Sequence, residues 1–146
     1  MPTYICRCDR NLLDVAKKSD VARVITDVHS EITGAPAYFA QVHFCEVEGG
    51  NMFIGGRALE HDHIFIEGRI RSGRSAADRE ALIKRLVGDV AAVAGVETFA
   101  VWVYLLELPP AAMAEFGHIL PEPGDETAWA DALPNEDRVR MQAISS

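Results

Sequence analysis

The order of the predicted elements repeats along this chain, and the repeat is what most constrains its fold. Strand-like alternation, a helical apolar stripe and a second strand-like run follow one another in residues 2–48. The same three patterns return in residues 62–110. Each unit is therefore expected to be β-α-β, and the crossover through its helix implies parallel pairing of its two strands. The predicted fold class is α+β, with two fused units forming one four-stranded sheet.

Capping residues predict where the two helices begin and end. In the first unit, Asn11 or Asp14 is suited to cap a helix that continues to Thr33, and Gly34 is suited to end it. In the second unit, Ser75 and Asp78 resemble a capping box, and Gly95 follows the last helical turn. The apolar positions recur at helical spacing in both: Val21, Val24, Ile25, Val28 and Ile32, then Leu82, Ile83, Leu86, Val87, Val90 and Ala94.

Strands are predicted on both sides of each helix, at residues 2–8, 38–47, 63–70 and 99–108. The last of these is apolar on both faces, which is typical of a strand covered on both sides. Two helices cover only one face of a four-stranded sheet, so we expect the other face to be covered by oligomerisation.

Residues 111–146 form an acidic segment that is expected to be loop-like. Trp129 is a candidate anchor for this tail, and Asn135 is a candidate cap for a short helix. We therefore expect the tail to wrap around the repeat, with residues 1–146 forming a single domain.

The composition narrows the class of protein. The 146 residues carry a net charge of −8, with 49% hydrophobic and 25% charged residues, as in a globular domain. An acidic chain is a poor partner for nucleic acid or an anionic membrane. No apolar run is long enough to span a membrane, and no signal peptide is visible. Three cysteines without zinc-finger spacing indicate free thiols and a cytoplasmic location.

Pro2 is the first candidate functional residue. If Met1 is removed, the nitrogen of Pro2 becomes a secondary amine, whose pKa is close enough to neutrality for acid or base chemistry. A strand that begins at this residue would hold the amine in a fixed position. The alternative is structural, because a proline is also tolerated at the start of an edge strand.

Arg71 and Arg74 flank a glycine just before the second predicted helix. Two guanidinium groups beside a helix N-terminus favour the binding of an anion, and of a carboxylate in particular. The alternative is that this loop is solvated and pairs with the acidic tail.

Three further residues could act together with the arginine loop. His29 lies near the edge of the buried face of the first helix and could donate a hydrogen bond to a carboxylate. Tyr104 and Glu115 could hold and activate a water molecule if they converge. Each also has a structural interpretation, as a surface histidine, a core tyrosine and a solvated acid.

A metal site is not predicted. His61 and His63 could share one face of a strand, but no third ligand is evident nearby, although His43 and Glu60 are present. The glycine-rich stretches match no phosphate-binding loop, and no cofactor is predicted.

Several motifs together resemble those of the tautomerase superfamily, and over most of the chain those of the cis-3-chloroacrylic acid dehalogenase family. Residues 64–108 are similar to the small 4-oxalocrotonate tautomerase module. The motifs are Pro2, Ile25-Thr-Asp-Val-His29, Ala40-Gln-Val, Phe53-Ile-Gly-Gly, Arg71-Ser-Gly-Arg74-Ser, Trp102-Val-Tyr104, Glu115-Phe-Gly and Leu120-Pro-Glu-Pro-Gly.

The resemblance implies a cofactor-free homotrimer that acts on a small carboxylate substrate. It implies that Pro2, Tyr104 and Glu115 are catalytic, and that His29, Arg71 and Arg74 bind the substrate. The implied reactions are keto-enol tautomerisation of unsaturated or 2-oxo acids, and water addition with hydrolytic dehalogenation of 3-haloacrylates. Phe116 departs from the family pattern, where a tyrosine is expected after the glutamate. The alternative is a ferredoxin-like binding module without catalysis, which has the same order of elements.

Overall fold

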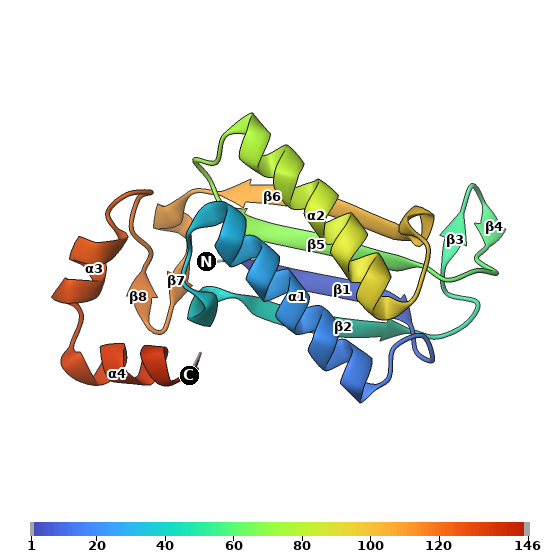
Figure 1. Ribbon diagram of the computed structural model, residues 1–146, viewed down its shortest axis with the longest axis horizontal. Helices are drawn as coiled ribbons and strands as arrows, with labels where there is room; N and C mark the ends of the chain where they lie inside the picture. Colours follow the sequence, from blue (N-terminus) through green and yellow to red (C-terminus); the bar gives the residue numbers. More distant parts are fainter. Residues whose placement is uncertain (1, 145–146) are drawn as a thin grey trace.

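The computed structural model describes residues 2–144 and contains a four-stranded sheet in the order β2-β1-β5-β6. Its strands are β1 (Thr3–Asp9), β2 (Gln41–Val47), β5 (Ile64–Arg71) and β6 (Val101–Leu108). β1 pairs with β2 in parallel, β5 pairs with β6 in parallel, and β1 and β5 are antiparallel. Helices α1 (Val15–Thr33) and α2 (Ala76–Ala94) lie on the same face of the sheet (Figure 1). The predicted α+β class and the parallel pairing within each unit are confirmed.

The helix ends are stabilised by the residues that the sequence indicated. The side chain of Asp14 accepts a hydrogen bond of 2.8 Å from the amide of Lys17 at the start of α1. Ser75 and Asp78 form a reciprocal capping box at the start of α2. Gly34 and Gly95 end the two helices in the left-handed conformation, which a residue without Cβ adopts at little cost.

The main core lies between the two helices and the sheet. Alternate residues of β1 point into it, so that Tyr4, Cys6 and Cys8 are fully buried while the residues between them are partly exposed. The other large buried side chains come from α1, α2 and β5: Val21, Ile25, Val28, Leu82, Leu86, Val90, Ile64, Ile66 and Ile70. All three cysteines are free.

The repeat is more extensive than the three elements of each predicted unit. α1 and α2 begin at residues 15 and 76, and end at 33 and 94, so they are 61 residues apart. The same spacing relates two short 3-10 helices, η1 (Ala37–Phe39) and η2 (Thr98–Ala100). It also relates two small hairpins, β3 (Phe53–Ile54) with β4 (Arg57–Ala58), and β7 (Ala114–Glu115) with β8 (His118–Ile119). Each unit therefore ends in a hairpin.

The ends of the first strands, Asp9 and Arg71, are 62 residues apart, because the loop before α2 is one residue shorter than the loop before α1. The register confirms this, since Thr3 pairs with Gln41 where Phe65 pairs with Trp102. Apart from one residue of the longer loop, each residue of one unit thus has a counterpart in the other. The pairs used below are Pro2 and Ile64, Tyr4 and Ile66, Asp9 and Arg71, His29 and Val90, and Ile54 and Glu115.

Two predicted strands differ from the structure. Residues 37–39, at the start of the predicted strand 38–47, form η1, and β2 begins only at Gln41. Strand 99–108 was predicted to be covered on both faces, but within a single chain only the face toward the helices is covered. On the other face, Trp102, Tyr104 and Leu106 are 40%, 57% and 43% exposed. β6 is also an edge strand, so its backbone groups along that edge are open to a partner as well as its exposed face.

The tail contains two helices where a largely loop-like segment was expected. After η3 (Pro110–Ala112) and the β7–β8 hairpin come α3 (Glu126–Ala132) and α4 (Asn135–Ile144). Trp129 packs against Phe39 with ring centroids 5.8 Å apart, and its indole N–H donates to the carbonyl of Ile119 at 2.8 Å. Leu120, Leu133 and Met141 complete this second, smaller core. It holds the tail against the end of the sheet at which the chain begins (Figure 1).

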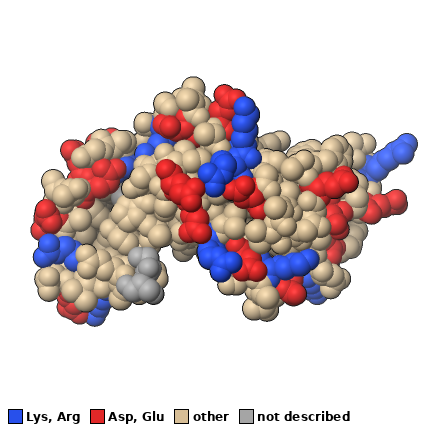
Figure 2. Space-filling model, in the orientation of Figure 1, with Lys and Arg blue, Asp and Glu red and all other residues tan. Residues whose placement is uncertain are grey.

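Charged side chains of both signs intermingle over the face of the molecule seen in Figure 2. Within residues 2–144, no helix has the length and apolar character needed to cross a membrane.

Candidate active site

One end of the sheet brings together the start of β1, the end of α1 and the end of β5. Thr3 pairs with Arg69 across the antiparallel strands, which places Pro2 beside the last residues of β5. Pro2 is buried, and its carbonyl accepts a hydrogen bond of 3.0 Å from the amide of Gln41. The start of the chain is therefore fixed by the sheet, as predicted for a strand that begins at Pro2. The expected removal of Met1 concerns a residue outside the described range.

His29 lies at the same end and is only 3% exposed. Its Nδ1 and the hydroxyl of Tyr4 are joined by a hydrogen bond of 2.8 Å, and the two rings meet edge to face. Gly68 makes room for this pair, because a Cβ at that position would lie 2.6 Å from Cε1 of Tyr4. The sequence predicted Tyr4 on the same face as the buried Cys6, but it gave no sign that Tyr4 would be the partner of His29.

Burial keeps the His29–Tyr4 pair neutral. It lowers the pKa of His29 to about 3, and the positive charge of Arg74 acts in the same direction. Burial also raises the pKa of the Tyr4 hydroxyl, so that the group stays protonated. The side chain of His29 is therefore a neutral imidazole at physiological pH, with one nitrogen already hydrogen-bonded to Tyr4.

Arg71, the last residue of β5, is buried and held by the tail. Its Nη1 donates to the carbonyl of Pro121 at 2.7 Å, and its Nη2 donates to the carboxylate of Glu126. Its Nε is buried and has no hydrogen-bond partner among the described residues. The expectation that this loop pairs with the acidic tail thus holds for Arg71, although the loop is not a solvated one.

Arg74 joins the arginine loop to the end of α1. Its Nη1 donates to the carbonyl of Thr33 at 3.0 Å, in the last turn of the helix that carries His29. Burial lowers the pKa of Arg74, and the nearby positive charge of Arg71 lowers it further, so the two guanidinium groups influence one another. The structure thereby brings Arg71 and Arg74 together with His29 at the start of the chain.

Glu115 lies in β7 at the rim of this end. It lines a cavity of about 580 Å³ that also includes Thr3 and Gln41, the neighbours of Pro2 in the strand and in the sheet. Aromatic and apolar residues complete the lining: Tyr38, Phe39, Met113, Phe116 and Ile144. Phe116 has a φ of 53°, a strained value for a residue with a Cβ, whereas its counterpart in the first unit is Gly55. The hairpin thus places a carboxylate beside the start of the chain.

Tyr104 does not line this cavity. It lies on the open face of β6, opposite the helices, and pairs in register with Glu67. Its ring meets that of Phe65 edge to face at 5.1 Å. Within one chain, Tyr104 and Glu115 line different hollows, and their joint action on a water molecule stays a prediction.

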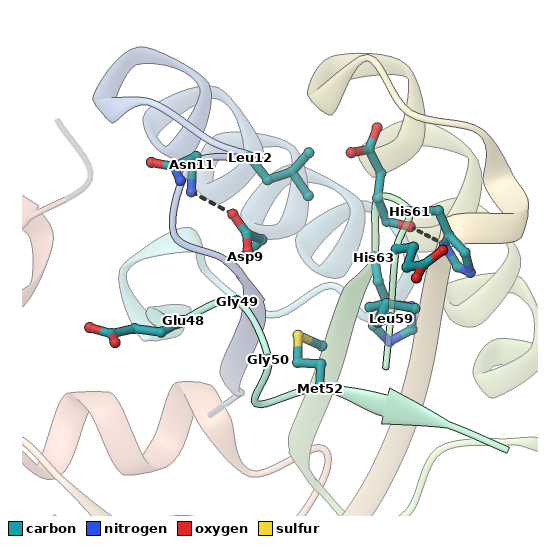
Figure 3. Close-up of a pocket in the computed structure, with 12 residues that line it drawn as sticks. Asp9, Asn11, Leu12, Glu48, Gly49, Gly50, Met52, Leu59, His61 and His63 are labelled. Carbon is teal, nitrogen blue, oxygen red and sulfur yellow. Dashed lines mark hydrogen bonds between the residues drawn. The ribbon is translucent and has the colours of Figure 1, made fainter. Parts of the chain in front are cut away.

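A second hollow, of about 390 Å³, lies at the opposite end of the sheet and contains His61 and His63 (Figure 3). His61 Nδ1 is hydrogen-bonded to the backbone carbonyl of Asp62, and the ring of His63 packs against Trp102. Within residues 2–144, no group of three histidine, cysteine or acidic side chains could hold a metal ion.

The arrangement at the first end is suited to an anionic ligand close to a chain terminus. Two guanidinium groups and a neutral imidazole can bind one carboxylate, while a carboxylate on the rim can orient water or a substrate hydroxyl. A family model described as "Putative oxalocrotonate tautomerase enzyme" matches residues 1–133. The chain belongs to this tautomerase family.

Solved structures of similar proteins agree with this assignment. The chain is 34% identical to N1, a member of the cis-3-chloroacrylic acid dehalogenase family, with a TM-score of 0.94 over 97% of this chain and 99% of N1. It is 32% identical to Ps01740, with a TM-score of 0.72 over 77% of this chain and 99% of that one. A fused 4-OT that forms an asymmetric trimer is 22% identical, with a TM-score of 0.74 over 80% of this chain and 94% of that one, and it shows the fold alone. None of the curated proteins compared with the chain matches it.

The tautomerase fold also rules out the ferredoxin-like alternative. In the ferredoxin-like arrangement each parallel pair is split by an intervening strand. Here β1 lies directly beside β2, and β5 directly beside β6. Membership of the family supports a tautomerase-type enzyme.

Proposed function

We propose that this tautomerase uses the amine of Pro2 to move a proton on small unsaturated or 2-oxo carboxylates. The observation that carries the proposal is the meeting of Pro2 with His29, Arg71 and Arg74 at one end of the sheet. We further propose that residues 1–146 act as one domain, with the tail completing the site. A cytoplasmic location remains part of the proposal.

His29, Arg71 and Arg74 are proposed to bind the substrate carboxylate. With the Tyr4 hydroxyl donating to Nδ1, the remaining ring hydrogen of His29 is on Nε2, which can donate to the substrate. A neutral donor adds a hydrogen bond without a third positive charge beside two arginines. This choice of tautomer is consistent with the lowered pKa of the imidazole.

Pro2 is proposed to exchange the proton once Met1 has been removed. As a neutral amine it takes the proton from the hydroxyl of an enol and returns it to the neighbouring carbon, which gives the keto acid. As an ammonium ion it serves a different reaction, the addition of water to a 3-haloacrylate. Water then attacks C3, Pro2 delivers a proton to C2, and loss of the halide and a proton leaves malonate semialdehyde.

Water addition requires Glu115 and Tyr104 together. Glu115 lines the cavity beside the start of the chain, whereas Tyr104 is exposed on the open face of β6. We propose a homotrimer in which neighbouring copies cover this face, so that Tyr104 of the partner subunit approaches Glu115. The apolar side chains of Trp102 and Leu106 on the same face support such a contact.

The proposal is tested by measuring the rate at which the protein ketonises an enolpyruvate. The loss of the ultraviolet absorbance of the enol reports this rate. Wild-type protein with Met1 verified as absent by mass spectrometry is expected to accelerate the reaction, and Pro2→Ala is expected to lower kcat by about 100-fold or more. Halide release from cis-3-chloroacrylate measures the second reaction separately.

A matched control keeps every side chain and changes only the amine. The same chain with one extra N-terminal residue carries an amide at Pro2, which neither accepts nor donates the proton. Its activity is expected to fall to the level of Pro2→Ala. Equal rates in all three proteins would refute the role of Pro2.

A further inference from the structure

Glu126 is a tail residue that contacts the arginine loop of the site, although no sequence motif pointed to it. It is the first residue of α3, and one carboxylate oxygen accepts a hydrogen bond from Nη2 of Arg71. The other oxygen accepts a hydrogen bond of 2.8 Å from the amide of Gly124. Both oxygens are thus held, one by the guanidinium group and one by the preceding turn.

The contact matters because Arg71 is unusually buried for a charged residue. Its side chain is 1% exposed. A buried charge without a partner costs several kcal/mol, so a fixed counter-ion is needed to keep the guanidinium in this position. Glu126 supplies the charge and the carbonyl of Pro121 supplies a second acceptor, and the tail thereby provides both partners of Arg71.

The two contacts also fix the orientation of the guanidinium group. Nη1 and Nη2 are engaged by the tail, whereas Nε is the nitrogen of Arg71 without a partner among the described residues. Nε is itself buried, so the whole guanidinium group is held rigidly beside Arg74.

Arginines outside the site are held differently, which shows that this arrangement is not a general feature of the fold. Arg10 lies at the opposite end of the sheet, where its side chain is 56% exposed and pairs with Glu46 and Glu48 on the surface. No tail segment covers it in this way, and its charge is screened by water.

We propose that Glu126 is the positioning residue of the anion site: its carboxylate fixes the guanidinium of Arg71 and offsets part of its charge, so that Arg71 and Arg74 together bind a single carboxylate. The inference rests on the proposed function for the identity of the ligand. It adds a residue from the tail that does not itself touch the substrate.

The charge on Glu126 is expected to affect both binding and the pH profile. Glu126→Gln keeps an oxygen within reach of Nη2 but removes the negative charge, so the field at the site becomes more positive. A more positive site binds a carboxylate more tightly and lowers the pKa of a nearby amine. We expect the dissociation constant of propionate, an unreactive carboxylate, to fall by about threefold or more. The pH midpoint of kcat/KM, set by the base, is expected to move to lower pH.

Two nearby carboxylates provide matched controls. Glu122 and Asp125 lie in the same segment and are exposed, so Glu122→Gln and Asp125→Asn change the net charge equally without touching Arg71. Both are expected to leave propionate binding and the pH midpoint close to wild type. Glu126→Asp keeps the charge but withdraws it by one methylene group, and it is expected to lie between wild type and Glu126→Gln in both measurements.

The outcomes separate this inference from the proposed function. Tighter propionate binding in Glu126→Gln together with the lowered pH midpoint supports it. Binding and a pH midpoint equal to those of Asp125→Asn would overturn it, as would weaker binding with an unchanged midpoint. If wild-type protein bound propionate but did not ketonise an enolpyruvate, the proposed function would fail. The response of propionate binding to Glu126→Gln and Glu126→Asp would still decide the role of Glu126.

Discussion

The two ends of the sheet are built by the same repeat, but only one of them carries the residues that we propose for catalysis. At the first end lie Pro2, His29, Arg71 and Glu115. Their counterparts around the second end are Ile64, Val90, Asp9 and Ile54. The backbones correspond residue by residue, down to the hairpins and the 3-10 helices, so the fold alone does not make the site.

The clearest difference is at the first position of each unit. Ile64 has an ordinary amide nitrogen, because the chain runs through it from the first unit into the second. Only the first unit can offer a chain terminus. Fusing two units into one chain therefore leaves a single end at which a proline amine is possible, and the charged partners are gathered at that end.

The tail increases the difference between the two ends. The first end is covered by the tail, in which Pro121 and Glu126 hold Arg71. The second end has the β3–β4 hairpin and an open hollow (Figures 1 and 3). A tail that belongs to only one unit breaks the symmetry of the repeat. It allows an arginine to be buried at one end of the molecule.

Among substitutions that compare the two ends, the largest effect is expected from replacing Arg71. Arg71→Ala removes a charge-assisted contact, worth about 1.5–3 kcal/mol, and is expected to lower kcat/KM by about 10- to 100-fold. The same change at its counterpart, Asp9→Ala, removes a hydrogen bond to the amide of Asn11 at the second end and is expected to leave kcat/KM within about twofold. Steady-state kinetics of both proteins test this, with circular dichroism as a check of folding. Equal losses would contradict the assignment of the site to the first end.

A smaller effect is expected at the buried pair of His29 and Tyr4, whose counterparts Val90 and Ile66 are both apolar core residues. His29→Val leaves the Tyr4 hydroxyl without its partner and is expected to cost about 1–3 kcal/mol of unfolding free energy. Adding Tyr4→Phe is expected to recover much of that loss, because both polar groups are then gone. Urea denaturation of the two single variants and the double variant measures the coupling. The double variant is nevertheless expected to have a raised KM, and a wild-type KM would argue against a role for His29 in binding.

The effect that is smallest near neutral pH is expected from the titration of His29, in the dependence of stability on pH. The pKa of His29 is lowered by burial to about 3, below the ordinary value of 6.5 that it has in the unfolded chain. The unfolded state therefore takes up a proton first, and this contribution to stability is complete above pH 6.5 and is lost as the pH falls towards 3. Its slope approaches about 1.4 kcal/mol per pH unit between these values. Urea midpoints from pH 7 to pH 4 are expected to fall less steeply in His29→Val, and parallel curves would contradict a buried neutral imidazole.

Much of the fold could be predicted from local patterns. Asp14, Ser75 and the two glycines Gly34 and Gly95 act through contacts within a few residues, so the sequence alone locates both helices. The alternation of Tyr4, Cys6 and Cys8 likewise indicates the buried face of β1. The hairpins were harder to recognise as parts of the repeat, because Ile54 and Glu115 differ in chemistry and share only their backbone geometry.

For the candidate site, the sequence by itself determined the residue types at Pro2, His29, Arg71, Arg74 and Glu115. The tertiary structure decided how they meet, because the antiparallel pairing of β1 with β5 brings the start of the chain to the end of β5. It also placed Tyr104 on the open face and added Tyr4 and Glu126, which are separated from their partners by 25 and 55 residues. Contacts over such separations leave no local pattern in the sequence, since they depend on the packing of whole elements.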